Sequence, residues 1–213
     1  ADLDPDLCKK IRASILLAGP MLARSGEMIL PPPGGDVIGR RRVDTHILAL
    51  KKLGAEVSYD RIFHFKAKKL IGANILLDEA SVTATENAIM ACVTAEGCST
   101  IRNAASEPHI QELCHFLTMM GAHIENIGSN TLQIEGVPKL HGCEFTVGSD
   151  YLEVLSFVGA AVVTHGSITI HNAGIEYLDM IKLVFQRIGV EWENRGDAIF
   201  VPSEQPLVIE PDL

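Results

Sequence analysis

Apolar residues recur along the chain in a pattern that is repeated three times. The segments 50–57, 117–124 and 185–192 each combine an apolar stripe, a glycine and a short apolar run. Counting back from the glycine, positions −1, −4 and −11 are apolar in every copy, and these offsets fall on one face of a helix. The glycines are Gly54, Gly121 and Gly189, and they are almost equally spaced along the chain. The pattern predicts three amphipathic helices, each ending at a glycine cap.

A second glycine precedes each of these helices. The set is Gly26, Gly97 and Gly166, which are again almost equally spaced. The residues before it read ASILLAGPMLA, TENAIMACVTA and EVLSFVGAAVV, which are apolar nearly all round, as in a helix buried on every side. Alignment on the glycines predicts that these helices begin near Arg12, Ser81–Thr85 and Asp150. We expect Ser106 to cap the amphipathic helix of the second copy, with Pro108 in its first turn.

Alternating polar and apolar residues predict half-exposed strands at 131–135, 145–147 and 167–171. The predicted fold class is therefore α/β: a pseudo-threefold domain of three repeated units, with buried central helices and small outer β-sheets. We expect one domain over residues 1–213, with internal repeats at about 12–78, 79–148 and 149–213.

Composition narrows the classes of function. A net charge of −9 argues against a nucleic-acid-binding face, and the longest apolar runs are far below the roughly 20 residues that span a bilayer. The amino-terminal residues lack the apolar stretch of a signal peptide. Five scattered cysteines without a C-x-x-C pair and eight scattered histidines predict neither disulfides nor a metal site. We therefore expect a cytoplasmic protein without a metal or cofactor, and with neither a nucleic-acid nor a membrane partner.

The first copy departs from the other two in one loop. Its two glycines, Gly26 and Gly54, lie four or five positions further apart than the matching pairs in the other copies, and the extra residues fall in Pro31–Arg40. A loop extended in one copy is not required by the fold, so binding or catalysis is the better explanation. Proline stiffens its base, while Gly34 and Gly35 allow the backbone to turn sharply at Asp36.

Three consecutive arginines, Arg40–Arg42, follow this loop and precede a predicted helix start at Val43–Asp44. The triplet could be a solvated surface, but the helix dipole and the guanidinium groups together favour an anion there. If the repeat symmetry holds, the three central helices also point their amino termini, with Arg12, toward one phosphate-binding end. His46 occupies a position where the other copies have Leu113 and Ile181, which leaves both a satisfied core histidine and a functional ligand open.

Four sequence strings resemble one enzyme family. They are RASILLAGP at 12–20, PGGDVIGRRRVDTH at 33–46, SVTATEN at 81–87 and NAASEP at 103–108. They are similar to motifs of the UDP-N-acetylglucosamine 1-carboxyvinyltransferases, the MurA enzymes. The resemblance implies the inside-out α/β barrel fold of the enolpyruvyl transferases, and an enzyme of two domains with this chain as one. It also implies transfer of the enolpyruvyl group from phosphoenolpyruvate to the 3-hydroxyl of UDP-N-acetylglucosamine, in peptidoglycan precursor synthesis.

The resemblance also implies roles for particular residues. Asp36 stands where the family has a loop cysteine and would donate a proton to the enol carbon, while Arg41 would hold the phosphate of phosphoenolpyruvate. Without the thiol, the epoxide fosfomycin should not inactivate the protein. The residues expected to bind substrates are Arg12, Arg41, Arg42, Val43, Asp44, Thr45, Glu79, Ala80, Ser81 and Val82.

Two alternatives follow from departures from the family pattern. Acidic Glu79 stands where many members have lysine, and Tyr151 stands where they have arginine; Thr83, Ser106 and His109 also differ. The chain could therefore be a non-catalytic module that binds nucleotide sugars. It could also belong to the sister enzyme, 5-enolpyruvylshikimate-3-phosphate synthase, although the loop around Asp36 is not that enzyme's signature.

Overall fold

The computed structural model describes residues 3–35 and 42–208. The backbone forms two compact units, an N-terminal unit of residues 1–145 and a C-terminal unit of residues 146–213. The boundary falls close to the predicted limit between the second and third repeats. Whether the repeats make up a single domain stays a prediction.

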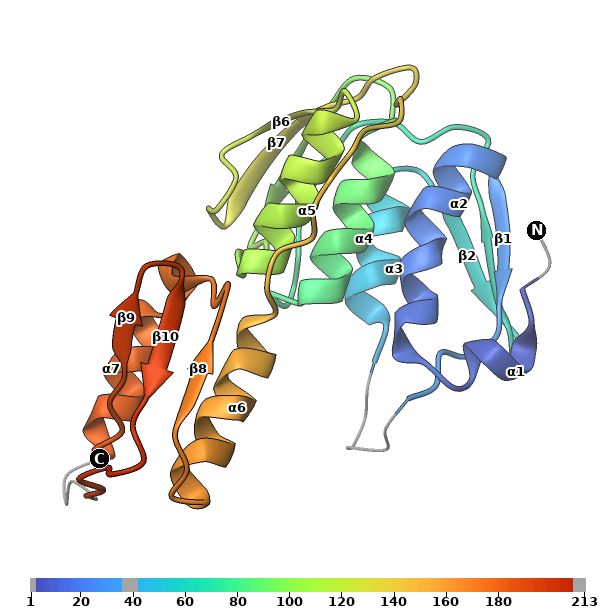
Figure 1. The fold of residues 1–213 in the computed structure, drawn as a ribbon. Coiled ribbons are helices and arrows are strands. Elements are labelled where there is room, and N and C mark those ends of the chain that lie inside the picture. Colours follow the sequence, from blue (N-terminus) through green and yellow to red (C-terminus); the bar gives the residue numbers. More distant parts are fainter. Residues whose placement is uncertain (1–2, 36–41, 209–213) are drawn as a thin grey trace. The chain divides into compact units, whose positions relative to one another are not determined.

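The N-terminal unit contains the first two repeats. Its helices are α1 (Pro5–Cys8), the 3-10 helix η1 (Arg12–Leu17), α2 (Ala18–Ser25), α3 (Asp44–Lys52), α4 (Val82–Cys92) and α5 (Pro108–Met119). Its strands are β1 (Glu27–Leu30), β2 (Glu56–Tyr59), β3 (Phe63–Lys66), β4 (Asn74–Leu76), β5 (Cys98–Arg102), β6 (His123–Glu125) and β7 (Thr131–Glu135). Figure 1 shows α2, α3, α4 and α5 side by side, with the strands outside them.

The C-terminal unit contains the third repeat and has the same order of elements. It consists of α6 (Tyr151–Val163), β8 (Ile168–Ile170), the 3-10 helix η2 (Ile175–Tyr177), α7 (Asp179–Arg187), β9 (Glu193–Arg195) and β10 (Ala198–Val201). Its core joins α6 to the sheet and includes Val158, Trp192 and Ile199. The repeat predicted from the glycine spacing thus corresponds to a recurring order of helix, strand, helix and hairpin.

Each repeat also forms its sheet in the same strand order. The antiparallel sheets are β1-β3-β2 in the first repeat, β5-β7-β6 in the second and β8-β10-β9 in the third, so the last strand always lies in the middle. Met28 pairs with Phe65 and Ile101 pairs with Leu132 across the central strands, and all four side chains are buried. One strand breaks the symmetry, because β4 of the first repeat pairs in parallel with β5 of the second.

The N-terminal unit packs around α4. This helix contacts η1, α2, α3, α5 and two strands, and it buries seven of its eleven residues. The central position predicted from its apolar composition is therefore confirmed. The prediction of burial on every side is wrong for α6, however, because α6 buries Val154 and Val158 but leaves Leu152, Phe157 and Val163 largely exposed.

The predicted starts and ends of helices can be compared with the structure directly. Arg12 begins η1, Ser81 caps α4 and Asp150 caps α6 with its side chain. The three predicted capping glycines, Gly54, Gly121 and Gly189, adopt φ of 97°, 98° and 77°, the left-handed conformation that a helix end requires.

Two local predictions are wrong. Glu107 rather than Ser106 precedes the first turn of α5, and the Ser106 carbonyl instead accepts a hydrogen bond from Gln111. Residues 145–147 form no strand, since their alternation has no neighbouring strand to pair with among the described residues. The third copy also differs from the other two at its first glycine, because His165 and not Gly166 takes the left-handed conformation there, whereas Gly26 and Gly97 take it in the first two copies.

The cysteines are free thiols. Cys8, Cys92 and Cys114 are buried, whereas Cys98 is exposed and Cys143 is half-buried. Burial raises the pKa of Cys92 to about 12 and that of Cys114 to about 11, so these two thiols stay protonated near neutral pH. Within the described residues, the structure has no helix long and apolar enough to cross a membrane.

Polar groups inside the core join four helices. His46 of α3 is 2% exposed, and its ring nitrogens lie 3.2 Å from Thr83 Oγ1 and 3.1 Å from Asn87 Nδ2, both on α4. Asn87 is fully buried and also contacts η1 and α2. The prediction of a satisfied core histidine is therefore confirmed. Burial, with the nearby Arg12 charge, lowers the pKa of His46 to about 4.

Close backbone contacts leave no room for a side chain at Gly136. A Cβ atom on Gly136 would lie 1.6 Å from the Ala95 carbonyl oxygen, whereas one on Gly142 would meet nothing within 4 Å. We expect Gly136→Ala to lower the free energy of unfolding by about 2 kcal/mol or more, and Gly142→Ala to change it by less than about 0.5 kcal/mol. Urea unfolding of the two variants tests this, and equal stabilities would contradict the described contact.

The lowered pKa of His46 predicts acid sensitivity. Between pH 6.5 and pH 4 the unfolded chain binds a proton at this ring and the folded chain does not, so folding stability falls as pH falls through this range. The loss amounts to about 3 kcal/mol at most, from a shift of roughly 2.5 pKa units. We expect His46→Gln to lose less unfolding free energy than the parent protein between pH 7 and pH 4. The measurement is the unfolding free energy in urea as a function of pH. If the parent protein and His46→Gln lose the same unfolding free energy between pH 7 and pH 4, the pKa of His46 is not lowered by folding.

Candidate active site

The predicted catalytic loop lies partly outside the described residues. Asp36 and Arg41 belong to the segment 36–41, which lies outside the described residues. The base of the loop is described and is closely packed. The Gly34 N–H donates to the Cys8 carbonyl over 3.2 Å, and a Cβ on Gly34 would collide with the Lys9 backbone. Gly35 has φ of 94°, as expected for a sharp turn just before Asp36.

Arg12 is held against the segment that follows the loop. Its Nη2 atom donates to the Arg42 carbonyl oxygen at 2.6 Å, which joins η1 to the segment just before α3, two residues from its start. The Arg42 side chain pairs with Asp44, with Nε 2.5 Å from Oδ2, and both side chains are more than half exposed. Solvent screens such a pair, so it orients the two side chains and contributes little to stability.

The start of α3 is tied to the residues that precede α4. Thr45 is buried, and its hydroxyl donates to Asp78 Oδ1 over 2.7 Å. Asp78 adjoins the predicted substrate-binding residues, of which Glu79 and Ala80 are exposed and Ser81 and Val82 are half-buried. The Ser81 hydroxyl caps α4 by accepting from the Ala84 N–H at 3.4 Å. Sequence analysis did not single out Asp78, since nothing in the pattern marks it as a partner of Thr45.

The predicted substrate-binding residues that the structure describes therefore come from three segments, which are connected by hydrogen bonds. Hydrogen bonds join Arg12 to Arg42 and Thr45 to Asp78, and His46 joins α3 to Thr83 in the first turn of α4. Val43, which precedes α3, is buried and makes no side-chain cap to that helix. The amino terminus of α3 thus starts beside Arg42, which contacts Arg12, and His46 joins α3 to the first turn of α4, an arrangement suited to an anion.

The charges at this place are mixed. Cationic Arg42 pairs with Asp44, Arg12 contacts the Arg42 carbonyl oxygen, and the Asp78 carboxylate is hydrogen-bonded to Thr45 of the same helix start. A ligand bound here would need both negative groups for the arginines and hydroxyl or amide donors for the carboxylates, as a phosphorylated sugar provides. His46 does not supply a proton here at neutral pH, because its lowered pKa keeps the ring neutral.

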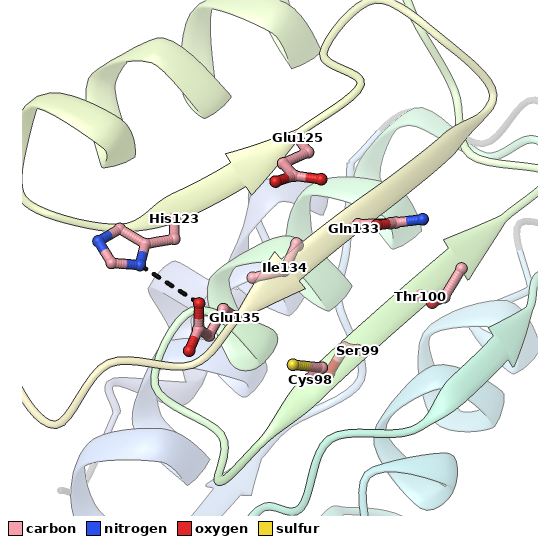
Figure 2. Close-up of a pocket in the computed structure, with 8 residues that line it drawn as sticks. All are labelled: Cys98, Ser99, Thr100, His123, Glu125, Gln133, Ile134 and Glu135. Atoms are coloured by element: carbon pink, nitrogen blue, oxygen red, sulfur yellow. Dashed lines mark ion pairs between the residues drawn. The ribbon is translucent and has the colours of Figure 1, made fainter.

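A separate cavity lies on the outer face of the sheet β4-β5-β7-β6. It measures about 160 Å³ and is lined by Cys98, Ser99, Thr100, His123, Glu125, Gln133, Ile134 and Glu135. Figure 2 shows the His123–Glu135 ion pair, with Nδ1 3.6 Å from Oε2, on the two strands β6 and β7. No predicted site residue lines this cavity. In the described parts of the chain, no group of three or more histidine, cysteine or acidic side chains is arranged to hold a metal ion.

Comparisons with solved structures support the fold. An enolpyruvyl transferase, NikO from Streptomyces tendae, matches with a TM-score of 0.81 over 95% of this chain and 49% of that protein, at 21% identity. The EPSP synthase of Acinetobacter baumannii matches with a TM-score of 0.65 over 92% of this chain and 47% of that protein. The predicted fold class, an enolpyruvyl transferase-like α/β fold, is therefore confirmed.

Sequence comparisons identify the family. Two similar relatives are UDP-N-acetylglucosamine 1-carboxyvinyltransferases, from Bradyrhizobium diazoefficiens with 54% identity over 213 residues and from Treponema pallidum with 54% over 208 residues. The chain covers 100% and 98% of its own length in these matches but 49% of each relative, so it spans about half the length of its curated relatives. The family model described as EPSP synthase (3-phosphoshikimate 1-carboxyvinyltransferase) matches residues 2–211, and the chain therefore belongs to this family of enolpyruvyl transferases.

Proposed function

We propose that the complete protein transfers the enolpyruvyl group of phosphoenolpyruvate to the 3-hydroxyl of UDP-N-acetylglucosamine and releases phosphate. The proposal rests on one observation above all: relatives that carry this name share 47% to 55% of their residues with nearly the whole chain. The arrangement of Arg12, Arg42–Thr45 and Asp78–Val82 supports it, because a nucleotide sugar carries both phosphates and hydroxyl groups.

The roles of this chain's residues follow from their positions and chemistry. Arg12 and the amino termini of α3 and α4 would bind the anionic part of the nucleotide sugar. Arg41 would hold the phosphate of phosphoenolpyruvate, and Asp36 would protonate its methylene carbon. Closure and dehydration of the loop would have to raise the pKa of the Asp36 carboxyl, which three adjacent arginines would otherwise lower.

The remaining half of the enzyme is part of the proposal. Because the chain spans about half of its relatives, we propose that the other half supplies the groups that complete the site. A cytoplasmic location and a role in peptidoglycan precursor synthesis belong to the same proposal. The acidic Glu79 beside the start of α4 would accept hydrogen bonds from hydroxyl or amide groups of the nucleotide sugar rather than contact its phosphates.

The first test measures phosphate release from phosphoenolpyruvate by the complete enzyme, with UDP-N-acetylglucosamine or shikimate 3-phosphate as acceptor. We expect phosphate release with UDP-N-acetylglucosamine as the acceptor and none with shikimate 3-phosphate. Arg12→Ala should weaken nucleotide-sugar binding by about tenfold or more, because a charge-assisted hydrogen bond to an anion is lost. Arg24→Ala, an exposed cation at the end of α2, is the matched control and should bind normally.

The acceptor decides between the alternatives. Turnover with shikimate 3-phosphate but not with the nucleotide sugar would establish the sister activity. Binding of the nucleotide sugar without turnover would establish a non-catalytic module. If Arg12→Ala binds the nucleotide sugar normally, Arg12 is not part of the binding site. That result would not contradict the proposed activity of the enzyme.

Asp36 predicts resistance to fosfomycin. The epoxide alkylates a thiol, and a carboxylate at this position offers no such nucleophile. We expect the complete enzyme to retain activity during incubation with fosfomycin, and Asp36→Cys to lose activity with time and gain the mass of the inhibitor. Asp36→Ser is the control, which should acquire no covalent label. Rapid labelling of the parent protein would contradict the placement of Asp36 in the loop.

A further inference from the structure

A side-chain amide is inserted into the backbone hydrogen bonds of the segment that carries Arg12. In a continuous α-helix, the Gly19 N–H would donate to the carbonyl oxygen of Ile15, four residues earlier. Here the Gly19 N–H donates to Asn87 Oδ1 at 2.6 Å, and Asn87 Nδ2 donates to the Ile15 carbonyl at 3.0 Å. Asn87 belongs to α4, and its side chain bridges the two groups where η1 passes into α2.

The inserted amide leaves no space for a side chain on the facing residue. A Cβ on Gly19 would lie 2.4 Å from the Asn87 carbonyl oxygen and 2.5 Å from Oδ1. On the amino-terminal side, the Ala18 N–H donates to the Ile15 carbonyl, which is the tighter spacing of a 3-10 helix. The insertion therefore coincides with the point where the 3-10 helix of residues 12–17 ends and the α-helix begins.

This transition determines where Arg12 lies. Each residue of a 3-10 helix advances the chain further along the axis, and turns it further around the axis, than a residue of an α-helix does. The difference is about 0.5 Å and roughly 20° per residue. If all of η1 became α-helical, Arg12 would therefore shift by about 3 Å along the axis and rotate by roughly 120°. Such a change would remove the Arg12 guanidinium from the Arg42 carbonyl oxygen.

His46 holds the amide in this orientation. The Ile15 carbonyl can only accept a hydrogen bond and the Gly19 N–H can only donate one, which fixes the nitrogen and oxygen ends of Asn87. The second Nδ2 proton therefore points to His46 Nδ1, which must accept it, and His46 Nε2–H then donates to Thr83 Oγ1. The ring is thus neutral and clamped between α3 and α4.

The Asn87–His46 pair consequently connects the three segments that carry the predicted substrate contacts. Asn87 contacts η1, which begins at Arg12, and His46 directly follows Asp44–Thr45. Thr83 lies in the turn that follows Ser81–Val82. We propose that Asn87 and His46 are positioning residues, which keep these predicted substrate contacts in the relative positions that an anionic nucleotide sugar requires. This inference rests on the proposed function.

The test compares variants of the complete enzyme. Asn87→Leu and His46→Leu remove the bridge or its clamp, and each should weaken UDP-N-acetylglucosamine binding by about tenfold or more while altering kcat less than KM. His46→Asn keeps an acceptor for Asn87 and should recover most of the affinity. Ile89→Ala is the control, because Ile89 is fully buried on α4 and makes none of these hydrogen bonds. It should lower the melting temperature and leave the affinity within about twofold.

The outcomes are distinct. Loss of affinity in both leucine variants, with recovery in His46→Asn, supports the proposal. Equal losses in Ile89→Ala and the leucine variants, or none in His46→Leu, would overturn it. If Asn87→Leu does not fold, the three-way comparison of His46→Leu, His46→Asn and Ile89→Ala decides the question.

A second measurement needs no substrate. A crystal structure of the Asn87→Ala variant should show the Gly19 N–H bonded to the Ile15 carbonyl and Arg12 displaced by about 3 Å. An unmoved Arg12 would refute the positioning role even if the parent enzyme is active. Failure of the parent protein to bind the nucleotide sugar would instead refute the proposed function, and this structural comparison would then decide the positioning role alone.

Discussion

Burying α4 without leaving its inner polar groups unpaired is the constraint on which the N-terminal unit depends. Unpaired buried hydrogen-bonding groups cost about 1–3 kcal/mol each, so a helix at the centre can carry them only where a partner is fixed. Thr85 meets this condition by donating to the Ser81 carbonyl and accepting from the Ala105 N–H, and Asn87 meets it through three partners. These hydrogen bonds satisfy the buried polar groups of α4. They also fix the distances between α4 and the neighbouring helices.

Much of the fold could be predicted from the sequence because its signals are local. A glycine in the left-handed conformation and an apolar stripe before it depend only on adjacent residues, and the structure confirms them at Gly54 and Gly121. The starts of η1, α4 and α6 also follow from local capping and apolar composition. Predictions failed where the outcome depends on distant partners. The run 145–147 alternates like a strand but pairs with no described strand, and α6 has an apolar face that its own unit does not cover.

The candidate site shows the same division. Sequence patterns marked Arg12 and the arginines before α3 as separate segments, because each lies beside a predicted helix start or a glycine. The family resemblance added the residues before α4. The residues that join these segments, Asp78 and Asn87, gave no such signal, since a hydrogen bond between residues 33 or 68 positions apart leaves no local pattern. Asn87 is one of several polar residues on α4, so its polarity alone did not distinguish it. Asp36 and Arg41 lie outside the described residues, and their roles remain predictions.

The parallel pairing of β4 with β5 has a consequence for how the repeats can be separated. The first repeat contributes β4 to the sheet of the second, so the edge of β5 is covered by a strand from the preceding copy. An uncovered edge strand exposes unpaired N–H and C=O groups that recruit other chains. Excising the second repeat at its sequence boundary would therefore yield a module prone to self-association. The unit of independent folding is longer than the unit of sequence repetition, and an ancestor built from single copies would have needed another way to shield that edge.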